Sequence, residues 1–510
     1  MIGRQSRCTL QLLFAEENFQ MSKIIGRKTE LSKLKERADS KNAQFLAIYG
    51  RRRVGKTFLI REFFATRDCI FCTVTGQNEA PRARQLAIFQ KELESTFFGG
   101  ERLPLLKTWD EAFEQLVVAV KTNAKNYPTK EIVVFLDELP WLATRKSGLL
   151  GALDHAWNTQ LQYVERLRLV VCGSAASFMT KNIIHSRGGL HNRLSGVFRL
   201  RPFSLSETKL YLAKIIGWTS NETQILELYM ALGGIPHYLS LVQKKLSAAQ
   251  NIGNLLFGDG ELSGEFDRLF SSLFAHSSVH MKVIKALASK NSGLTREEIL
   301  KAVGKVSGET TSVVLHELDE AGFIMRFQSI HKKNRGDIYR LMDEFSLFHC
   351  RWLESIQSQS LLGNPVDYWL RQSQTQPFAI WSGYAFENIC LKHASLLKKK
   401  LGFAAVNCKI GPFYTHLAGE ESEGAQIDLV FERADGVTTL VEMKYRQDLF
   451  TVTKIERLNL ERKVRVYTES TRTKQYVNVA LVTPYGVKPN EHSQSIMSGE
   501  VTLVDLFGEE

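Results

Sequence analysis

The fold is decided by residues 45–57, which read FLAIYGRRRVGKT. Five apolar residues typical of a buried strand come first, and the next eight match the pattern G-x-x-x-x-G-K-[ST]. The apolar stretch that follows, residues 58–64, has the character of a helix. Backbone amides in such a loop point inward at the positive end of a helix and bind phosphate groups. The residues predicted to bind a nucleotide are Gly50, Arg51, Arg52, Arg53, Val54, Gly55, Lys56 and Thr57.

Carboxylates and a polar residue follow two further apolar strands. Residues 131–136 precede Asp137 and Glu138, and residues 169–172 precede Gly173 and Ser174. Because parallel strands end at one edge of a sheet, these side chains are expected near the phosphate loop. Asp137 and Thr57 are predicted to hold Mg²⁺, and Glu138 is predicted to act as the base that activates water.

Two arginines are further candidates for the nucleotide site. Arg187 and Arg193 precede the last predicted strand of this region, and we favour Arg193 for stabilising charge in the transition state. An arginine in a structural ion pair is the alternative interpretation. Ser174 is predicted to sense the terminal phosphate or the attacking water.

The pattern along the chain indicates several domains. Strand-like runs alternate with amphipathic helices first, which predicts a parallel sheet covered by helices. A helical region, three helices with a hairpin, and a second mixed region follow. The predicted parts are an N-terminal extension (1–20), a nucleotide-binding core (21–203), a helical lid (204–276), a winged helix-turn-helix (277–345), a helical connector (346–377) and a second α/β domain (378–510).

Composition excludes several classes of protein. Lys and Arg number 66 against 54 Asp and Glu, a net charge of +12, which suits a phosphate-bearing partner or a basic solvated surface. No apolar run approaches the roughly 20 residues of a membrane-spanning helix. The seven cysteines are too scattered for a disulfide framework, so we expect a cytoplasmic protein. The pair Cys69 and Cys72 suits a core strand better than a metal site, and Met21 is a candidate start.

A second set of candidate residues lies in the last 130 residues. Asp428 follows a short strand, and Glu442 and Lys444 end another strand fourteen residues later. Since side chains alternate along a strand, Glu442 and Lys444 share a face, and a hairpin can bring Asp428 opposite them. Two carboxylates then hold Mg²⁺ while Lys444 orients or deprotonates a water that attacks a phosphodiester. Glu387, in a predicted helix, is a candidate third carboxylate; the alternative is an exposed charged sheet face.

Charge near this second set favours a polyanionic partner, whereas the predicted winged helix does not favour reading of bases. From residue 444 to 474 there are nine Lys or Arg and four Asp or Glu, a net of 9 − 4 = +5. A solvated helix face would have the same composition. The third helix of the predicted winged helix, residues 309–321, has four acidic residues and no Lys or Arg, which repels DNA phosphates. Docking of domains suits that helix better, although the basic segment 331–336 could touch a backbone.

In this order, the motifs resemble the archaeal-type ATPases, a STAND-like branch of the AAA+-related P-loop proteins. Many of these carry a winged helix and a C-terminal domain similar to the PD-(D/E)xK restriction endonucleases. The resemblance rests on Ile25-Gly26-Arg27, Glu30-Leu31, Gly50 to Thr57, Phe135 to Glu138, Cys172-Gly173-Ser174, Gly233 to Leu239, Asp343 to Phe348, Asp428 and Glu442-Met443-Lys444. It implies ATP and Mg²⁺ as cofactors, Pro236 near the nucleotide, and a nuclease-type site at Asp428, Glu442, Lys444 and Glu387.

The expected fold is therefore multidomain α/β: a P-loop NTPase core with an AAA+-like parallel sheet, a helical lid, a winged helix and a restriction-endonuclease-like domain. The expected function is an ATP-hydrolysing switch coupled to Mg²⁺-dependent DNA cleavage, with genome defence as its setting. DNA is the favoured partner, mainly through the C-terminal domain, and a homo-oligomer is a second expectation. One alternative is an ATP-controlled scaffold that binds DNA or protein without cleaving it; a transcription factor is another, against which the acidic helix argues.

Overall fold

The computed structural model describes residues 23–144, 147–185, 190, 192–274, 277–304, 306–328, 337–354, 365–415 and 424–509. The predicted N-terminal extension, Met21, Arg187 and the basic segment 331–336 lie outside these residues. The chain divides into two compact units, Met1–Pro202 and Phe203–Glu510, and each is described by itself. Among the described residues, no helix combines the length and apolar character that crossing a bilayer requires.

The first unit is built on a parallel sheet with the strand order β2-β3-β4-β1-β5. The strands are β1 (Gln44–Tyr49), β2 (Cys69–Thr75), β3 (Glu131–Asp137), β4 (Leu167–Gly173) and β5 (Gly196–Arg199). Every residue of β3 and β4 is buried, as expected for central strands covered on both faces. The predicted parallel sheet covered by helices is confirmed.

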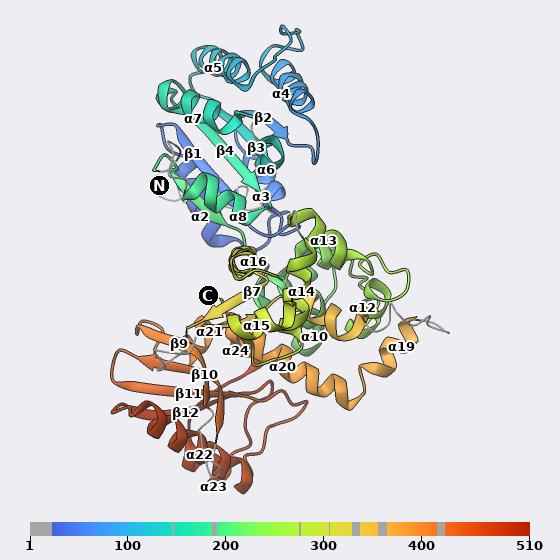
Figure 1. Cartoon of the computed structure of the whole chain (residues 1–510), viewed down its shortest axis with the longest axis vertical. Coiled ribbons are helices and arrows are strands. Elements are labelled where there is room, and N and C mark those ends of the chain that lie inside the picture. The colour runs from blue at the N-terminus through green and yellow to red at the C-terminus, as the bar shows by residue number, and fades with distance from the viewer. Residues whose placement is uncertain are drawn as a thin grey trace, which may run out of the picture. The chain divides into compact units, whose positions relative to one another are not determined.

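Helices cover both faces of this sheet. Residues of α4 (Arg82–Phe97), α5 (Trp109–Asn126) and α7 (Leu149–Thr159) share one buried core with alternate residues of β1 to β4 (Figure 1). On the opposite face, Phe64 of α3 (Lys56–Ala65) meets Phe71 of β2, which meets Phe135 of β3, each with ring centroids 6.1 Å apart. The remaining helices of this unit are α2 (Lys28–Ala38), α6 (Leu139–Leu142), η2 (Leu161–Tyr163), α8 (Ala176–Met179) and η3 (Thr180–Ile184).

The second unit begins with helices. These are α9 (Leu205–Tyr211), η4 (Leu212–Ile216), α10 (Glu222–Leu232), α11 (Pro236–Leu239), α12 (Ala248–Leu256) and α13 (Glu265–Leu273). Ser204 and Ser247 form capping boxes with Glu207 and Gln250, so the starts of α9 and α12 are encoded locally.

Residues 277–345, which we call the three-helix segment, contain three helices and a small sheet. The helices are α14 (Ser277–Ala288), α15 (Arg296–Val303) and α16 (Gly308–Glu320), and the sheet has the order β6-β8-β7. Its strands are β6 (Leu294–Thr295), β7 (Ile324–Phe327) and β8 (Ile338–Leu341). The three helices and the hairpin of β7 and β8 agree with the predicted pattern, whereas the short strand β6 was not predicted.

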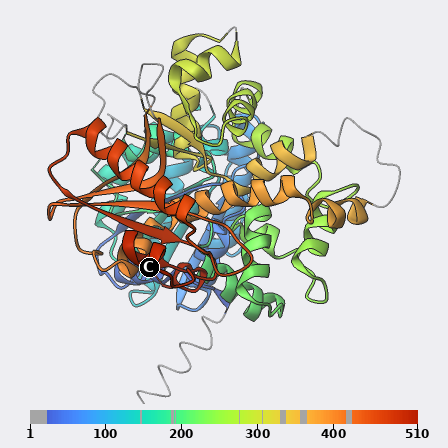
Figure 2. The same cartoon turned by 90° about the horizontal axis from the view of Figure 1, so that it is seen from below.

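A mixed five-stranded sheet, order β13-β12-β11-β10-β9, forms the C-terminal part. Its strands are β9 (Cys408–Thr415), β10 (Ala425–Arg433), β11 (Val437–Met443), β12 (Tyr476–Val482) and β13 (Met497–Val501). The pairs β9–β10 and β10–β11 are antiparallel, whereas β11–β12 and β12–β13 are parallel. Helix α22 (Lys454–Thr471) lies along this sheet, where its Tyr467 packs with Phe413 and Leu440 (Figures 1 and 2).

Helices connect and complete the C-terminal part. They are α17 (Glu344–Phe348), η5 (His349–Leu353), α19 (Pro365–Gln372), α20 (Gln376–Lys392), α21 (Ala394–Lys400), α23 (Glu491–Ile496) and α24 (Leu503–Leu506). The sequence predicted a single helix over residues 384–399. The structure instead has α20 and α21 with His393 between them, and α20 begins earlier, where Pro377 suits the first turn.

Candidate functional site

The phosphate-binding loop joins the carboxyl end of β1 to the start of α3. Gly50 has a φ of 145°, and a Cβ there would lie 2.2 Å from the backbone oxygen of Leu200, so a glycine is required. Gly55, with a φ of 90°, is the N-cap of α3. The loop therefore ends at a helix N-terminus, where backbone N–H groups without helical partners favour an anion.

Lys56 is folded back over this loop. Its side chain is buried, and its Nζ donates hydrogen bonds to the backbone oxygens of Gly50 at 3.0 Å and Arg51 at 2.9 Å. These carbonyls hold the ammonium group at the mouth of the loop. A terminal phosphate entering the loop would offer the same ammonium a charged acceptor, which makes a stronger hydrogen bond than a carbonyl.

The structure brings Thr57 and Asp137 together, as the order of the strands predicts. The Thr57 hydroxyl donates a hydrogen bond to Oδ2 of Asp137 at 2.8 Å, across 80 residues of sequence. Asp137 is buried at the end of β3. A hydroxyl and a carboxylate are the hard oxygen ligands that Mg²⁺ prefers, so these two residues fit the predicted metal.

Glu138 and Ser174 are also in direct contact. Oε2 of Glu138 accepts hydrogen bonds from the backbone N–H of Ser174 at 3.1 Å and from its hydroxyl at 2.8 Å. Glu138 adopts the left-handed backbone conformation, with a φ of 47°, which is unusual outside glycine and turns the chain from β3 into α6. The candidate base is thus held against the candidate sensor at the carboxyl edge of neighbouring strands.

Two contacts of the loop, with Arg27 and with Trp141, were not predicted from the sequence. Nη2 of Arg27, which is buried, donates to the backbone oxygen of Val54 at 3.2 Å. The Arg52 guanidinium lies 5.9 Å from the ring centroid of Trp141 in α6, within the range of a cation–π contact. No spacing rule links positions so far apart in sequence.

Arg193 and Pro236 are described but are not tied to the loop by an observed contact. Arg193 is exposed in a turn before β5, and its backbone N–H donates to Leu190 at 3.2 Å. Pro236 is the first residue of α11 in the second unit, where it suits the first turn of a helix. The roles predicted for both residues stay predictions.

Comparison with known proteins identifies the region that contains this loop. Residues 24–242 match a family described as ATPase domains found predominantly in Archaea. These residues are an archaeal-type ATPase domain. The loop, Asp137, Glu138 and Ser174 all lie within it.

The chain is also similar to individual proteins and solved structures. An uncharacterised protein of Methanocaldococcus jannaschii is 26% identical over 334 residues, which is 65% of this chain and 69% of the relative. Among solved structures, a Walker-type ATPase of Pyrococcus abyssi aligns with a TM-score of 0.43 and 19% identity, covering 64% of this chain and 96% of its own. The ORC2 protein of Aeropyrum pernix aligns with a TM-score of 0.41 and 12% identity, covering 68% and 94%.

The C-terminal candidates come together outside the ATPase domain. We call Glu387 of α20, Asp428 of β10 and Glu442 of β11 the carboxylate cluster. Leu429 pairs with Val441 in the antiparallel ladder, so the register brings Asp428 opposite Glu442. Oδ2 of Asp428 accepts a hydrogen bond from the backbone N–H of Met443 at 2.9 Å. This is the juxtaposition that the sequence predicted.

Burial makes two of these carboxyl groups weaker acids than usual. Burial, and second the charge of Asp428, raise the pKa of Glu442 to about 7. The same two causes raise the pKa of Glu387 to about 7. Because Asp428 affects both glutamates, the three carboxylates are close enough for their charges to interact. A divalent cation would relieve this repulsion.

Each glutamate of the cluster already has a cationic partner. Nζ of Lys463 donates to Oε1 of Glu442 at 2.6 Å, and Nζ of Lys444 lies 3.7 Å from Oε2 of the same carboxylate. Nη2 of Arg340 donates to Oε2 of Glu387 at 2.9 Å. Within the described residues, no group of three or more His, Cys, Asp or Glu side chains is arranged to hold a metal ion. The three carboxylates thus do not form a ready metal-ligand set.

Lys463 and Arg340 are the members of this site that sequence reasoning missed. Lys463 carries a usable signal, since it lies four residues before the buried Tyr467 and so on the inner face of α22. Arg340 carries none, because its partner is 47 residues away on another element. A charged residue in a short strand is ordinarily read as solvent-exposed, whereas Arg340 is 3% exposed.

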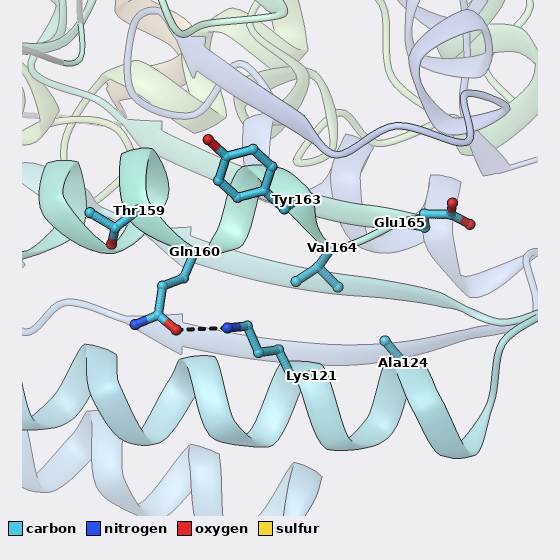
Figure 3. Close-up of a pocket in the computed structure, with 7 residues that line it drawn as sticks. All are labelled: Lys121, Ala124, Thr159, Gln160, Tyr163, Val164 and Glu165. Atoms are coloured by element: carbon cyan, nitrogen blue, oxygen red, sulfur yellow. Dashed lines mark hydrogen bonds between the residues drawn. The ribbon is translucent and has the colours of Figure 1, made fainter.

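A shallow depression of about 290 Å³ on the ATPase domain is separate from the nucleotide site (Figure 3). Nζ of Lys121 donates to Oε1 of Gln160 at 2.7 Å across it. Val164 and Glu165 lie beside the amino end of β4, whereas the phosphate loop follows the carboxyl end of its parallel neighbour β1. The depression is therefore at the opposite end of the sheet. It is lined by Lys121, Ala124, Thr159, Gln160, Tyr163, Val164 and Glu165.

Proposed function

We propose that this protein is a switch that hydrolyses ATP in its archaeal-type ATPase domain. Binding and hydrolysis of ATP control the Mg²⁺-dependent cleavage of DNA by the C-terminal part of the chain. The observation that carries the proposal is that one chain holds two separate sets of phosphate-directed groups. One is the phosphate loop with Thr57, Asp137 and Glu138, and the other is the carboxylate cluster with Lys444.

The hydrolytic half assigns a task to each residue of the first set. The loop and Lys56 bind the phosphates, and Thr57 and Asp137 hold the metal. Bound Mg²⁺ supplies positive charge that draws electron density from the phosphate oxygens. Glu138 takes a proton from the attacking water, which requires its carboxylate to exchange Ser174 for that water. Ser174 is then available to sense the terminal phosphate, and Arg193 stabilises charge in the transition state.

For the cleavage of DNA, Asp428 and Glu442 are the residues that would hold the metal. These carboxylates lie on paired strands and supply hard oxygen ligands. Lys444, which directly follows the end of β11, orients or deprotonates the attacking water. The basic residues of α22, which lies on this sheet, offer contacts to a phosphate backbone. DNA is the substrate that this arrangement suits, and genome defence remains a prediction about its setting.

The three-helix segment has a structural task in this proposal. Its arrangement suits a winged helix, but His280 of α14 is within 2.8 Å of Glu317 of α16, so part of the acidic third helix serves packing within the segment. We therefore propose that the segment docks domains and does not read bases. Self-association of the chain is a separate expectation.

One observation favours a second function, in which the C-terminal sheet binds DNA or protein without cleaving it. Both glutamates of the cluster are paired with cations of the same chain, Arg340 and Lys463. A site whose carboxylates stay neutralised internally would need no metal. In that case ATP would control assembly of a scaffold, and binding would survive the Asp428→Ala substitution.

Phosphate release by the purified full chain tests the ATPase half. Lys56→Ala should weaken nucleotide binding, because it removes a charge-assisted hydrogen bond worth about 1.5–3 kcal/mol, or roughly 10- to 100-fold. Glu138→Gln should keep binding but lower turnover about 10²–10⁴-fold, since the general base is lost. Unchanged phosphate release in both variants would refute this half.

Digestion of plasmid DNA, single-stranded DNA and RNA, each with Mg²⁺ or Mn²⁺ and with or without ATP, tests the cleaving half. Asp428→Ala and Lys444→Ala should abolish cleavage in proteins whose circular dichroism is that of the wild type. Absence of cleavage by the wild type under every condition, together with DNA binding that survives Asp428→Ala, would favour the scaffold.

A further inference from the structure

Arg340 is the point at which the three-helix segment reaches the carboxylate cluster. It lies on β8, the central strand of the order β6-β8-β7, opposite Met325 of β7. Its ion pair with Glu387 is largely buried, with side-chain exposures of 4% for Arg340 and 13% for Glu387. Cations that are fully buried are rare unless they are paired, so the pair is a specific feature of this fold.

Further contacts fix α20 against the same stretch of chain. Nδ2 of Asn388 donates to the backbone oxygen of Leu341 at 2.9 Å in a buried hydrogen bond. Nζ of Lys392 donates to Oε1 of Glu344 at 2.6 Å. Residues 387, 388 and 392 of α20 are thus bound by residues 340, 341 and 344. The three-helix segment and the start of α17 therefore help to set the position of Glu387, together with the packing of Phe386 of α20 on Tyr445.

The Arg340 charge acts on Tyr414 as well as on Glu387. Tyr414 of β9 lies close enough to Arg340, Glu387 and Asp428 for all three charges to influence its hydroxyl. A cation at this place opposes a second cation, because like charges repel strongly where water is excluded. While Arg340 binds Oε2 of Glu387, this oxygen is not available to a metal held by Asp428 and Glu442.

We propose that Arg340 is a positioning residue of the cleavage site: it keeps Glu387 away from the metal and so limits the affinity of the cluster for a divalent cation. This inference rests on the proposed function, since it requires a metal at Asp428 and Glu442. Displacement of β8 would free Glu387 as a third ligand. The three-helix segment thereby controls how tightly the cluster holds its metal.

The inference is tested without any cleavage assay by measuring the affinity of the nucleotide-free full chain for Mn²⁺ at pH 8. Calorimetric titration gives this affinity. All proteins carry Lys56→Ala and Thr57→Ala, so that the nucleotide site contributes no metal binding. In this background we compare the parent protein, which keeps Arg340, with four variants: Arg340→Met, Arg340→Lys, Asp428→Ala and Lys392→Met. Lys392→Met is the matched control, because it breaks the other side-chain ion pair of α20 with the same stretch but leaves Glu387 paired.

Arg340→Met should bind Mn²⁺ about tenfold more tightly, because it removes one positive charge and frees one carboxylate. Arg340→Lys keeps the charge and should resemble the parent, which also provides a folded variant for comparison. Glu387→Gln added to Arg340→Met should remove the gain. Lys392→Met should not change the affinity.

Equal or weaker binding by a folded Arg340→Met protein would overturn the inference alone, and so would an equal gain in Lys392→Met, which would point to loosened docking of α20. The absence of any Mn²⁺ binding that Asp428→Ala abolishes would instead overturn the proposed cleavage site, and the inference with it.

Discussion

Thr57 is the residue whose assigned task can be separated most cleanly from folding. Its hydroxyl is 2.8 Å from Asp137, and only the hydroxyl is needed to bind Mg²⁺. Thr57→Ala should raise the Mg²⁺ concentration required for half-maximal phosphate release about tenfold or more. Thr57→Ser, which keeps the oxygen, is the control and should stay close to the wild type. The same Mg²⁺ dependence in all three proteins would remove Thr57 from the metal site.

Glu227 of α10 gives the second unit a stability that depends on pH. Burial raises the pKa of this carboxyl to about 7. A group with a raised pKa in the folded state stabilises the fold below its unfolded pKa, near 4.3, and this contribution is lost as the pH rises through about 7. The wild type should therefore lose stability between pH 5 and pH 8.

The neutral variant Glu227→Gln should lose less stability over this range and should be more stable than the wild type by about 2 kcal/mol at pH 8. Thermal unfolding at several pH values measures the effect. Glu222→Gln, on the same helix but in an ion pair with Lys209, is the control. Identical pH profiles for Glu227→Gln and the wild type would contradict the prediction.

Sequence reasoning worked at the residue scale where the chemistry is local. The phosphate loop could be predicted from the sequence because its residues are consecutive. The pairing of Asp428 with Glu442 could be predicted because a short hairpin joins their strands. The cationic partners of the two glutamates were missed, although the position of Lys463 on α22 carried a usable signal. Arg340 lies 47 residues from Glu387, and Lys463 lies 21 residues from Glu442 on a helix that crosses the sheet. Side-chain partners of this kind depend on packing, which spacing does not encode.

At the scale of elements, strand β4 is anchored to the chain that precedes β1 by a buried arginine. Arg168 is fully buried and donates hydrogen bonds to the backbone oxygens of Ala38 at 2.6 Å, Asn42 at 3.0 Å, Ser40 and Leu167. It also lies 3.8 Å from Glu131, which Arg67 binds through both carboxylate oxygens. The anchor fixes the amino end of the sheet, opposite the phosphate loop.

Arg168→Leu should destabilise the first unit by about 3 kcal/mol, because the buried carbonyls lose their donor. The corresponding calorimetric transition should fall by about 6 °C or more. Lys130→Met, which breaks the exposed pair with Asp68, is the control and should cost no more than about 1 kcal/mol. Equal effects of the two substitutions would show that Arg168 is not an anchor.

The elements that were missed from sequence are edge strands. β9 contains Gly411 and Pro412, which ordinarily argue against a strand, but proline is tolerated at an edge that needs no further partner. β13, at the other edge, reads Met-Ser-Gly-Glu-Val and lacks the alternation of a half-buried strand. Interior strands β10 to β12 were predicted because burial on the sheet demands β-branched and apolar residues.

At the scale of the whole molecule, the net charge of +12 leads us to expect that the proposed binding of DNA weakens as salt rises. If the basic residues of the C-terminal part neutralise about six phosphates, affinity should fall about 10³-fold between 50 and 200 mM salt. Fluorescence anisotropy of a labelled duplex measures this fall. A variant with Arg465→Ala and Arg472→Ala should show a shallower slope, whereas binding that is insensitive to salt would exclude phosphate contacts as its source.

The central claim is that the chain cleaves DNA with the metal held by Asp428 and Glu442. The most direct test is the rate at which supercoiled plasmid becomes nicked or linear in Mg²⁺ and ATP, measured for the wild type and for a folded Asp428→Ala variant. The account predicts conversion by the wild type and a rate at least about 100-fold lower for Asp428→Ala. Equal rates for the two proteins, or no conversion by the wild type, would contradict it.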